Sequence, residues 1–323
     1  MAHDADGIPA PDDEQLLGRV AWYYHHDGLT QDEVGRRLGL SRIKVSRLLD
    51  RAKRAGVIGI TIHSTNRDCL ALEGRLRERH GLAEAIVIPA LPPPPGGHET
   101  PLATNERLTQ AAASYLMNFI SDGSVLAVGW GDTVTRTLKR LGHLLGHNGA
   151  SVVTLTGGVS TYLQMMGGLS APIAQAQRLH MIPSPLITSR AATARALLEE
   201  PAVQEVIAMA RRADCALIGI GALEEDASLV RGGYLSNEEL AAYRAMGAVG
   251  DILGRFLDHR GRLLDLEIHD RIVGIDLQSL SAIARVIGVA GGAHKVEAIR
   301  AVLAGGTLDM LITDEPTART LLG

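Results

Sequence analysis

The basic residues between positions 34 and 56 are the side chains of this sequence best suited to bind a polyanion. Eight arginines and lysines stand there against a single acid, Asp50. A cluster of this density is typical of a nucleic-acid-binding surface, although a solvated helix face can have the same composition. The candidate DNA contacts combine these bases with neighbouring polar and apolar residues: Thr30, Gln31, Ser41, Arg42, Ile43, Lys44, Ser46, Arg47 and Arg51.

The elements that must position these residues are predicted by helix signals on both sides of the cluster. Apolar residues spaced three and four apart indicate a first helix that ends near residues 27–28. Thr30 and Glu33 have the spacing of a capping box and begin a second helix. Gly39 can end that helix in a left-handed conformation, and Ser41 caps a third, basic helix. Two helices joined by a tight turn predict a helix-turn-helix.

A strand after the third helix would complete a winged version of this domain, because isoleucines alternate with other residues there: Ile58, Ile60 and Ile62. The first turns of the third helix would enter the major groove of DNA. There arginine and lysine can reach guanine edges or phosphates, Ser46 can contact either, and Ile43 can contact a thymine methyl group. The spacing does not decide which side chain contacts bases and which contacts phosphates.

From about residue 66 onward, short apolar runs that end in glycine or threonine alternate with helix-like stretches. This alternation predicts βαβ units and a mostly parallel sheet. We therefore expect a DNA-binding domain at 1–65 and an α/β domain at 66–323, in which ligands would bind at the carboxyl ends of the strands. The expected strands are 85–88, 124–128, 151–156, 215–220, 286–290 and 308–312.

Two loops at expected strand ends carry groups suited to a small polar or anionic ligand. Gly-Trp-Gly-Asp-Thr at 129–133 follows a strand and opens a helix, so its backbone N–H groups and threonine hydroxyl would face a ligand. Gly-Gly-Ala-His-Lys at 291–295 has the same context and adds one of four lysines in the chain. An ammonium there suits a phosphate, a group of hydroxyls or a Schiff base. An ordinary strand-to-helix turn and a solvated lysine remain the alternatives.

Whole-chain properties exclude several classes of protein. A content of 46% hydrophobic and 21% charged residues is typical of a folded globular chain. No apolar run approaches the roughly 20 residues that span a bilayer, and the acidic N-terminus is unlike a signal peptide, so we expect a cytoplasmic protein. Cys69 and Cys215 form no CxxC pair and are expected to be reduced thiols. The net charge of −4 conceals the basic cluster, because the first 33 residues carry eight acids and one base.

The common enzyme motifs are incomplete in this sequence. The loop at 129–133 lacks the third glycine of a dinucleotide fingerprint, and no P-loop or zinc motif occurs, so no cofactor or metal is expected. The enzyme alternative that remains is a sugar-phosphate isomerase or a Schiff-base aldolase that uses Lys295, with Asp251, Asp314 or Glu315 as acids. A DNA-architectural protein is disfavoured because about 250 residues of α/β domain exceed what that role requires.

With these residues the chain resembles the SorC family of sugar-responsive bacterial transcriptional regulators over nearly its whole length. The likeness rests on residues 29–34 and 40–49, and then on 128–133, 156–158, 250–251, 288–295 and 313–315. It implies an effector domain related in fold to phosphosugar isomerases, an oligomer that is commonly a tetramer, and a sugar, polyol or sugar phosphate as effector. The expected function is control of a carbohydrate or polyol catabolic operon, as a repressor, through an effector-induced shift between arrangements that do and do not match the operator.

The resemblance also implies which residues form the effector pocket: Gly129, Gly131, Asp132, Thr133, Gln164, Arg231, Asp251 and Lys295. Asp132 departs from the pattern, because phosphosugar-binding relatives tend to have a neutral or basic residue there. A carboxylate about 4 Å from a phosphate oxygen would cost about 4 kcal/mol at an effective dielectric of about 20. We therefore hypothesise an unphosphorylated sugar or polyol, of the erythritol kind, with a phosphosugar as the competing effector.

Overall fold

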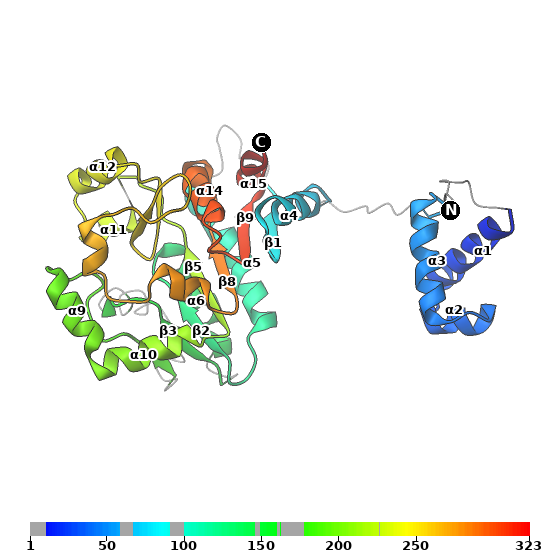
Figure 1. Ribbon diagram of the computed structural model, residues 1–323, viewed down its shortest axis with the longest axis horizontal. Helices are drawn as coiled ribbons and strands as arrows, with labels where there is room; N and C mark the ends of the chain where they lie inside the picture. Colours follow the sequence, from blue (N-terminus) through cyan, green and yellow to red (C-terminus); the bar gives the residue numbers. More distant parts are fainter. Residues whose placement is uncertain are drawn as a thin grey trace, which may run out of the picture. The chain divides into compact units, whose positions relative to one another are not determined.

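The computed structural model describes residues 11–58, 67–90, 100–145, 149–159, 162, 178–225 and 227–323 (Figure 1). The chain divides into two compact units, Met1–Thr65 and Asn66–Gly323. Within the described ranges, no helix is both long enough and apolar enough to cross a membrane.

The first unit contains the helix-turn-helix that the sequence predicts. Its elements are α1 (Pro11–Ala21), a π-helical turn η1 (Trp22–His26), α2 (Gln31–Leu38) and α3 (Arg42–Arg54). The capping box is confirmed, since the Glu33 backbone N–H donates to Thr30 Oγ1 at 3.3 Å and the Thr30 N–H donates to Glu33 Oε2 at 2.8 Å. Gly39 ends α2 with φ of +65°, and the side chain of Ser41 caps α3.

The three helices enclose a small apolar core formed by Leu17, Val20, Val34, Val45, Leu48, Leu49 and Ala52. Gly35 makes the tight turn possible, because a Cβ atom there would lie 2.6 Å from the Leu40 carbonyl oxygen. The rest of α3 faces solvent and carries the basic side chains. Of the predicted wing, Ile60 and Ile62 lie outside the described residues.

The second unit is built on a seven-stranded sheet in which every neighbouring pair is parallel. The strand order is β1-β9-β8-β5-β2-β3-β4. Six of these strands confirm the predicted ones within about two residues; the two-residue β4 was not predicted. The strands are β1 (Glu84–Ile88), β2 (Val125–Val128), β3 (Ser151–Thr154), β4 (Leu179–His180), β5 (Cys215–Gly219), β8 (Val286–Val289) and β9 (Met310–Asp314).

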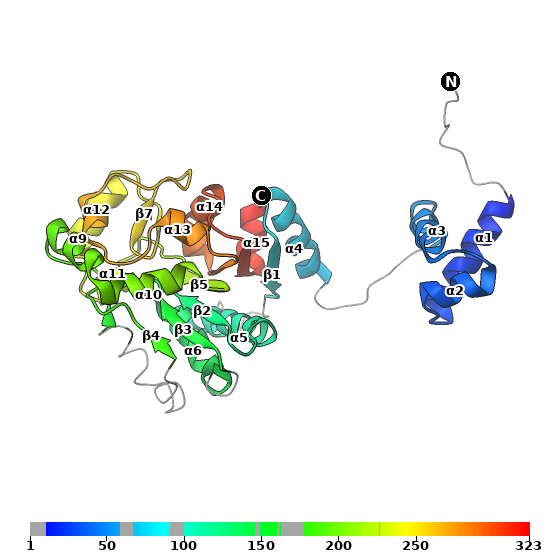
Figure 2. The same cartoon turned by 60° about the horizontal axis from the view of Figure 1, so that its bottom comes forward.

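Successive residues of each strand pack against opposite helix layers. In β2, Leu126 and Val128 belong to the apolar cluster that includes α5 (Pro101–Phe119) and α6 (Asp132–Leu145). Ala127 belongs to the opposite cluster, which includes α4 (Arg67–His80), α10 (Pro201–Arg211), α14 (Val296–Ala304) and α15 (Glu315–Leu322). Figure 2 shows α5 and α6 together on one side of the sheet. Both cysteines are buried and free, as expected of reduced thiols.

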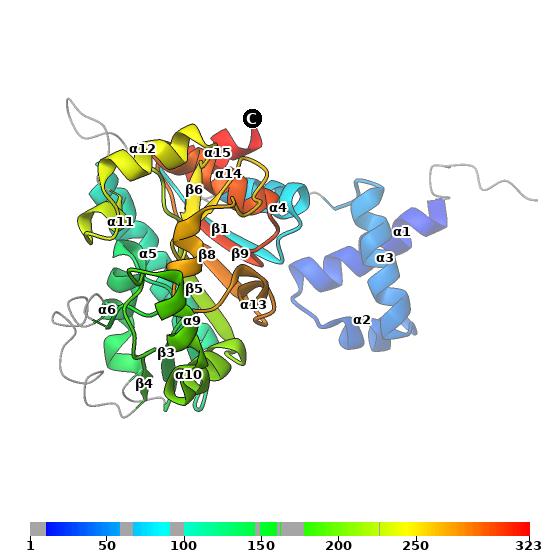
Figure 3. The ribbon, with the colours of Figure 1, turned by 60° about the vertical axis from the view of Figure 1, so that its left-hand side comes forward.

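A segment between β5 and β8 forms a third apolar cluster beside the sheet. It contains a short antiparallel hairpin, β6 (Gly250–Ile252) and β7 (Arg255–Leu257), that the sequence did not predict. Its helical pieces are α11 (Ser228–Arg231), α12 (Asn237–Ala245) and η2 (Glu267–Arg271), of which α11 and α12 lie next to each other (Figure 3). The remaining helices are α9 (Ala191–Glu199), α13 (Leu277–Ser281) and η3 (Ala293–Lys295).

Candidate functional site

The carboxyl ends of β2, β5 and β8 lie side by side and open into a cavity of about 460 Å³. In the sheet, β3 lies on one side of β2, whereas β5 and then β8 lie on its other side. The cavity is therefore at a topological switch point, which is where α/β sheets commonly bind ligands. Gly131 lines the cavity, and Gly292 belongs to the loop after β8; their φ values of +123° and +98° lie in a region that other residues rarely adopt.

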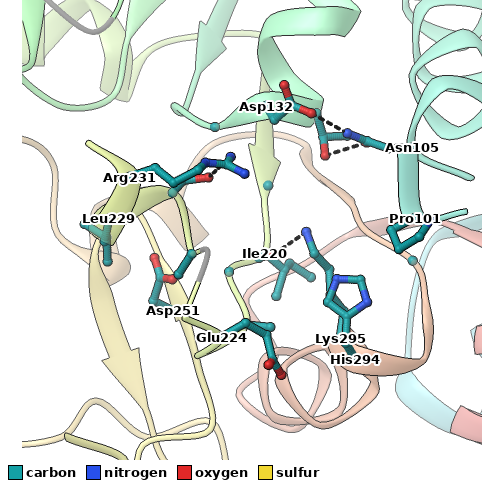
Figure 4. Close-up of a pocket in the computed structure, with 18 of the residues that line it drawn as sticks. Pro101, Asn105, Asp132, Ile220, Glu224, Leu229, Arg231, Asp251, His294 and Lys295 are labelled. Atoms are coloured by element: carbon teal, nitrogen blue, oxygen red, sulfur yellow. Dashed lines mark hydrogen bonds between the residues drawn. The ribbon is translucent and has the colours of Figure 1, made fainter. Parts of the chain in front are cut away.

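Six of the predicted effector residues line this one cavity (Figure 4): Gly131, Asp132, Thr133, Arg231, Asp251 and Lys295. Gly129 does not line it, because it packs inward, where a Cβ atom would lie 2.9 Å from Leu253 Cδ2. Gln164 lies outside the described residues. The structure therefore brings together residues that are up to 164 positions apart in the sequence.

One wall of the cavity is formed by the start of α6 and a side chain from α5. Asn105 Nδ2 donates a hydrogen bond to Asp132 Oδ2 at 2.8 Å, and Thr133 Oγ1 donates to Asn105 Oδ1 at 2.8 Å (Figure 4). Thr133 is buried although it lines the cavity, and about two-fifths of the Asp132 side chain is exposed. This wall is thus a fixed network of polar groups.

The environment of Asp132 removes the basis of the hypothesis of an unphosphorylated effector. Arg136 Nε donates to Asp132 Oδ2 at 2.8 Å, and Arg136 also pairs with Glu106. The hydrogen bond that Arg136 donates to Asp132 raises the pKa of Arg136 above its usual range. Because the carboxylate already has a cationic partner, its repulsion of a nearby phosphate is much weaker than the sequence argument assumed.

The opposite side of the cavity carries two cationic side chains. Lys295 Nζ donates to the Ile220 carbonyl oxygen at 3.1 Å, which ties the loop after β8 to the end of β5. Arg231 Nη2 donates to Ser228 Oγ at 3.4 Å. Figure 4 shows the ends of both side chains pointing toward the space that lies below Asp132 in this view. His294 and Glu224 line the cavity as well, so the ligand space is bordered by charges of both signs.

Asp251 is the buried carboxyl group of the site, with 8% of its surface exposed. Burial raises its pKa to about 6, against the opposing effects of a hydrogen bond from the Gly254 N–H at 3.0 Å and of the positive charge of Lys295. Its backbone pairs with that of Gly221 in a β-bridge. A Cβ atom at Gly221 would lie 1.8 Å from Asp251 Oδ1, so a glycine is required there.

Two acids that the enzyme alternative invoked have other partners. Asp314 accepts hydrogen bonds from the N–H groups of Gly292 and Thr317, and so holds the loop after β8 and caps α15. Glu315 accepts from Arg319 and from the Ala90 N–H, contacts that lower its pKa. Neither residue lines the cavity.

Among the cavity residues that were not predicted from the sequence, Asn105 has the clearest structural role. It lies on α5, far from any glycine loop, and reaches the site only because α5 packs against α6. No local motif marks such a residue. Trp130, also in the lining, belongs to the predicted loop but was not proposed as a contact.

The predicted DNA-binding residues lie along α2 and α3 of the first unit. Thr30 and Ser41 cap these helices, while Gln31 and Ser46 are half-buried. The remaining candidates are exposed: Arg42, Ile43, Lys44, Arg47 and Arg51. Ile43 is 67% exposed, although it is an aliphatic residue on a folded helix.

Comparison with known proteins identifies the family. The family model described as "Putative sugar-binding domain" matches residues 64–323. "Transcriptional regulator LsrR" of Klebsiella pneumoniae subsp. pneumoniae is 44% identical over 313 residues, covering 96% of this chain and 93% of that protein. The protein of the same name from Escherichia coli K12 is 40% identical, over 96% and 95% of the two chains. The chain belongs to this family of sugar-binding-domain transcriptional regulators.

The family assignment extends to the three-dimensional structure. The crystal structure of the full-length sorbitol operon regulator SorC from Klebsiella pneumoniae matches with a TM-score of 0.66 at 25% identity, over 97% of this chain and 100% of that one. The resemblance to SorC regulators is thereby confirmed, and so is the combination of a helix-turn-helix with a parallel α/β unit. The chain is a transcriptional regulator of this family.

Proposed function

We propose that this regulator represses a carbohydrate or polyol catabolic operon and that a sugar, a polyol or a sugar phosphate in the β2/β5/β8 cavity controls its affinity for the operator. The observation that carries the proposal is the convergence of Asp132, Thr133, Arg231, Asp251 and Lys295 on one cavity, in a chain whose first unit exposes a basic helix. Polar side chains of both charges around a cavity of this kind suit a small polyhydroxylated ligand.

The cavity is compatible with a phosphorylated effector. Arg231 and Lys295 supply positive charge on one side, and Asp132 is paired with Arg136 on the other. The proposal therefore keeps sugar phosphates and unphosphorylated sugars as candidate effectors, with no preference taken from Asp132.

The α3 helix is the proposed recognition helix. Its N-terminal turns would enter the major groove, with Arg42, Lys44 and Arg47 on bases or phosphates and Thr30, Gln31, Ser41, Ser46 and Arg51 in supporting contacts. Operators of paired half-sites would then require at least two copies of the chain, and a homotetramer is the assembly that we propose. Sedimentation equilibrium of the full chain tests this assembly.

A catalytic role is not part of the proposal. Lys295 donates to a backbone carbonyl, and both Asp314 and Glu315 serve as caps or ion-pair partners. In the described part of the chain, no group of three or more His, Cys, Asp or Glu residues could hold a metal ion. We propose accordingly that the ligand is sensed and released unchanged, in the cytoplasm.

The test begins with selection of binding sites for the full chain from a random duplex library. The selected site, labelled with a fluorophore, is then titrated with the protein in the presence of a panel of sugars, polyols and their phosphates. The proposal predicts a specific site and at least one compound that changes the dissociation constant. A chain that enriches no sequence, or that converts a panel compound into product, contradicts it.

A further inference from the structure

Arg42 and Asp32 form an ion pair between the two helices of the helix-turn-helix. Arg42 is the first residue of α3, and Asp32 lies in the first turn of α2. Arg42 Nη1 lies 3.9 Å from Asp32 Oδ2, and 69% and 65% of the two side chains are exposed. The pair therefore lies on the surface of the first unit, at the end of α3 that would enter the major groove.

The other acid in the first turn of α2 has a different role. The carboxylate of Glu33 accepts the Thr30 N–H at 2.8 Å and completes the capping box. This hydrogen bond lowers the pKa of Glu33. The cap of α2 is thus complete without Asp32, whose carboxylate faces Arg42.

The ion pair leaves a defined part of the Arg42 guanidinium for DNA. A guanidinium carries five N–H donors in a rigid plane. With Nη1 turned toward Asp32, the edge formed by Nε and Nη2 remains, and its two N–H groups are parallel. Two parallel donors match the O6 and N7 acceptors of guanine in the major groove. They match two oxygens of a phosphate equally well, so hydrogen-bond geometry alone does not decide between guanine and phosphate.

The charge of Asp32 decides between these two contacts. A phosphate that bound Arg42 would also come close to the Asp32 carboxylate and would be repelled by it. A guanine edge carries no net charge and meets no such repulsion. The ion pair also offsets the charge of Arg42 and so weakens its attraction to the phosphates of a duplex. The carboxylate beside Arg42 therefore favours a base contact over a phosphate contact.

We propose that Arg42 reads a guanine of the operator and that Asp32 holds the Arg42 guanidinium for this contact and away from phosphates. Asp32 acts through Arg42 and is a positioning residue. Phosphate contacts fall to other exposed basic residues of α3, such as Lys44 and Arg47. This inference rests on the proposed DNA-binding function and adds one base that the first unit recognises.

The test replaces each guanine of the selected site, singly and in one half-site, by 7-deazaguanine, which lacks the N7 acceptor but still pairs with cytosine. Fluorescence anisotropy gives the dissociation constant of the full chain for each duplex. At one guanine the wild type should bind about fivefold more weakly, the lower end of what a bidentate arginine contact contributes. Arg42→Ala should be insensitive there, and in Asp32→Asn the loss should fall to within about twofold, because a surface ion pair has a modest effect.

Salt dependence gives a second readout. Each phosphate contact adds about 0.9 to the slope of log affinity against log salt concentration. Arg42→Ala should keep the wild-type slope, since its arginine makes no phosphate contact. In Asp32→Asn the released Arg42 can bind a phosphate, so the slope should steepen by about 0.9 and the affinity for a non-selected duplex should rise.

Two control variants separate positioning from a general change of charge or structure. Asp50→Asn removes an exposed carboxylate from α3 and should keep both the guanine sensitivity and the salt slope of the wild type. Asp32→Glu retains the charge and should restore the sensitivity. A merely structural effect of Asp32→Asn would weaken binding to all duplexes in parallel and leave the sensitivity to 7-deazaguanine unchanged.

The outcomes distinguish this inference from the proposed function. Equal sensitivity of wild type and Arg42→Ala at every guanine overturns the inference, as does a selected site without guanine. Identical behaviour of Asp32→Asn and Asp50→Asn also overturns it. In each of these cases specific DNA binding remains. A chain that selects no DNA sequence contradicts the proposed function and the inference that rests on it.

Discussion

Ile43 gives the proposed DNA-binding surface its most specific feature. It is 67% exposed in the first turn of α3, between Arg42 and Lys44, while the other large aliphatic residues of that helix are buried. The neighbouring Lys44 and the other exposed basic residues of α3 attract the protein to DNA of any sequence, because every nucleotide carries a phosphate. An exposed isoleucine adds nothing to that attraction, but it can contact a thymine methyl group in the major groove.

We predict that replacing one thymine in a single half-site of the selected operator by deoxyuridine weakens binding of the wild-type chain about fourfold, the value of one buried methyl group at about 0.8 kcal/mol. Ile43→Ala should be insensitive to the same replacement. Arg54→Ala, at the other end of α3, should weaken all sites equally and keep the sensitivity. Fluorescence anisotropy with each single deoxyuridine measures the effect, and equal sensitivity of wild type and Ile43→Ala at every thymine contradicts the assignment.

Asp251 makes stability depend on pH in a predictable direction. Its pKa is about 6 in the folded chain against 3.8 for an unperturbed aspartate, so the folded state holds the proton more tightly. The penalty of ionising this carboxyl is absent below pH about 4, grows as the pH rises through the folded pKa, and is fully present at pH 7.

Asp251→Asn should therefore stabilise the second unit at pH 7 by about 1 to 3 kcal/mol and have a much smaller effect at pH 4. Chemical denaturation at the two pH values measures the difference. The variant should also lose its response to the effector, because the carboxyl lines the cavity. A variant that is destabilised at pH 7 would show that burial is not the main influence on this group.

At the scale of elements, three strand ends and one hairpin have to meet for the cavity to exist. The loops after β2, β5 and β8 supply one part of it, and the bridge between Gly221 and Asp251 brings β6 to the same place. The fit is tight, since Gly221 has no room for a methyl group beside the Asp251 carboxyl.

Gly221→Ala should displace the Asp251 side chain and cost about 1 to 3 kcal/mol of stability, as overpacking does in a filled core. We expect the DNA affinity of the variant to stay near that of the wild type at 25 °C and the effector response to be lost. Gly74→Ala, on α4, is the comparison, because a Cβ atom there would have no neighbour within 4 Å and the residue does not line the cavity. A normal effector response of Gly221→Ala contradicts the need for this contact.

The sequence predicts elements whose causes are local. Thr30, Glu33, Gly39 and Ser41 specify the helix-turn-helix through caps that involve three or four residues each. Apolar runs flanked by glycine likewise indicate the long parallel strands. The β6–β7 hairpin escapes prediction because its strands have three residues each, which is too short for a pattern.

The site shows the same division between local and long-range causes. Loops 129–133 and 291–295 carry their own glycine signals, and their residues line the cavity, with the exception of Gly129, Gly292 and Ala293. Asn105 and the pairing of Asp132 with Arg136 depend on how α5 and α6 pack, which no local motif describes. Asp132 gives no preference for an unphosphorylated effector for that reason: the charge of a side chain is known from the sequence, but its ion-pair partner is not.

At the scale of the whole molecule, the net charge of −4 is a poor guide to function. Eight of the 32 basic residues lie between positions 34 and 56, where Asp50 is the single acid, and eight of the 36 acids lie in the first 33 residues. The two units can respond to each other only through linkage, and an effector can shift DNA affinity by no more than its preference for one state over the other. Coupling of about 1 to 3 kcal/mol is typical, or about 5-fold to 150-fold in affinity.

The most direct test is one anisotropy experiment on the selected operator, with and without the active compound of the panel, for three full-length proteins. The wild type should change its dissociation constant about 5-fold to 150-fold on adding the compound. Arg47→Ala should bind the operator more weakly but keep that factor, and Lys295→Ala should bind as the wild type does and show no change. An unaltered response in Lys295→Ala, or none in the wild type to any sugar or sugar phosphate, would contradict the account.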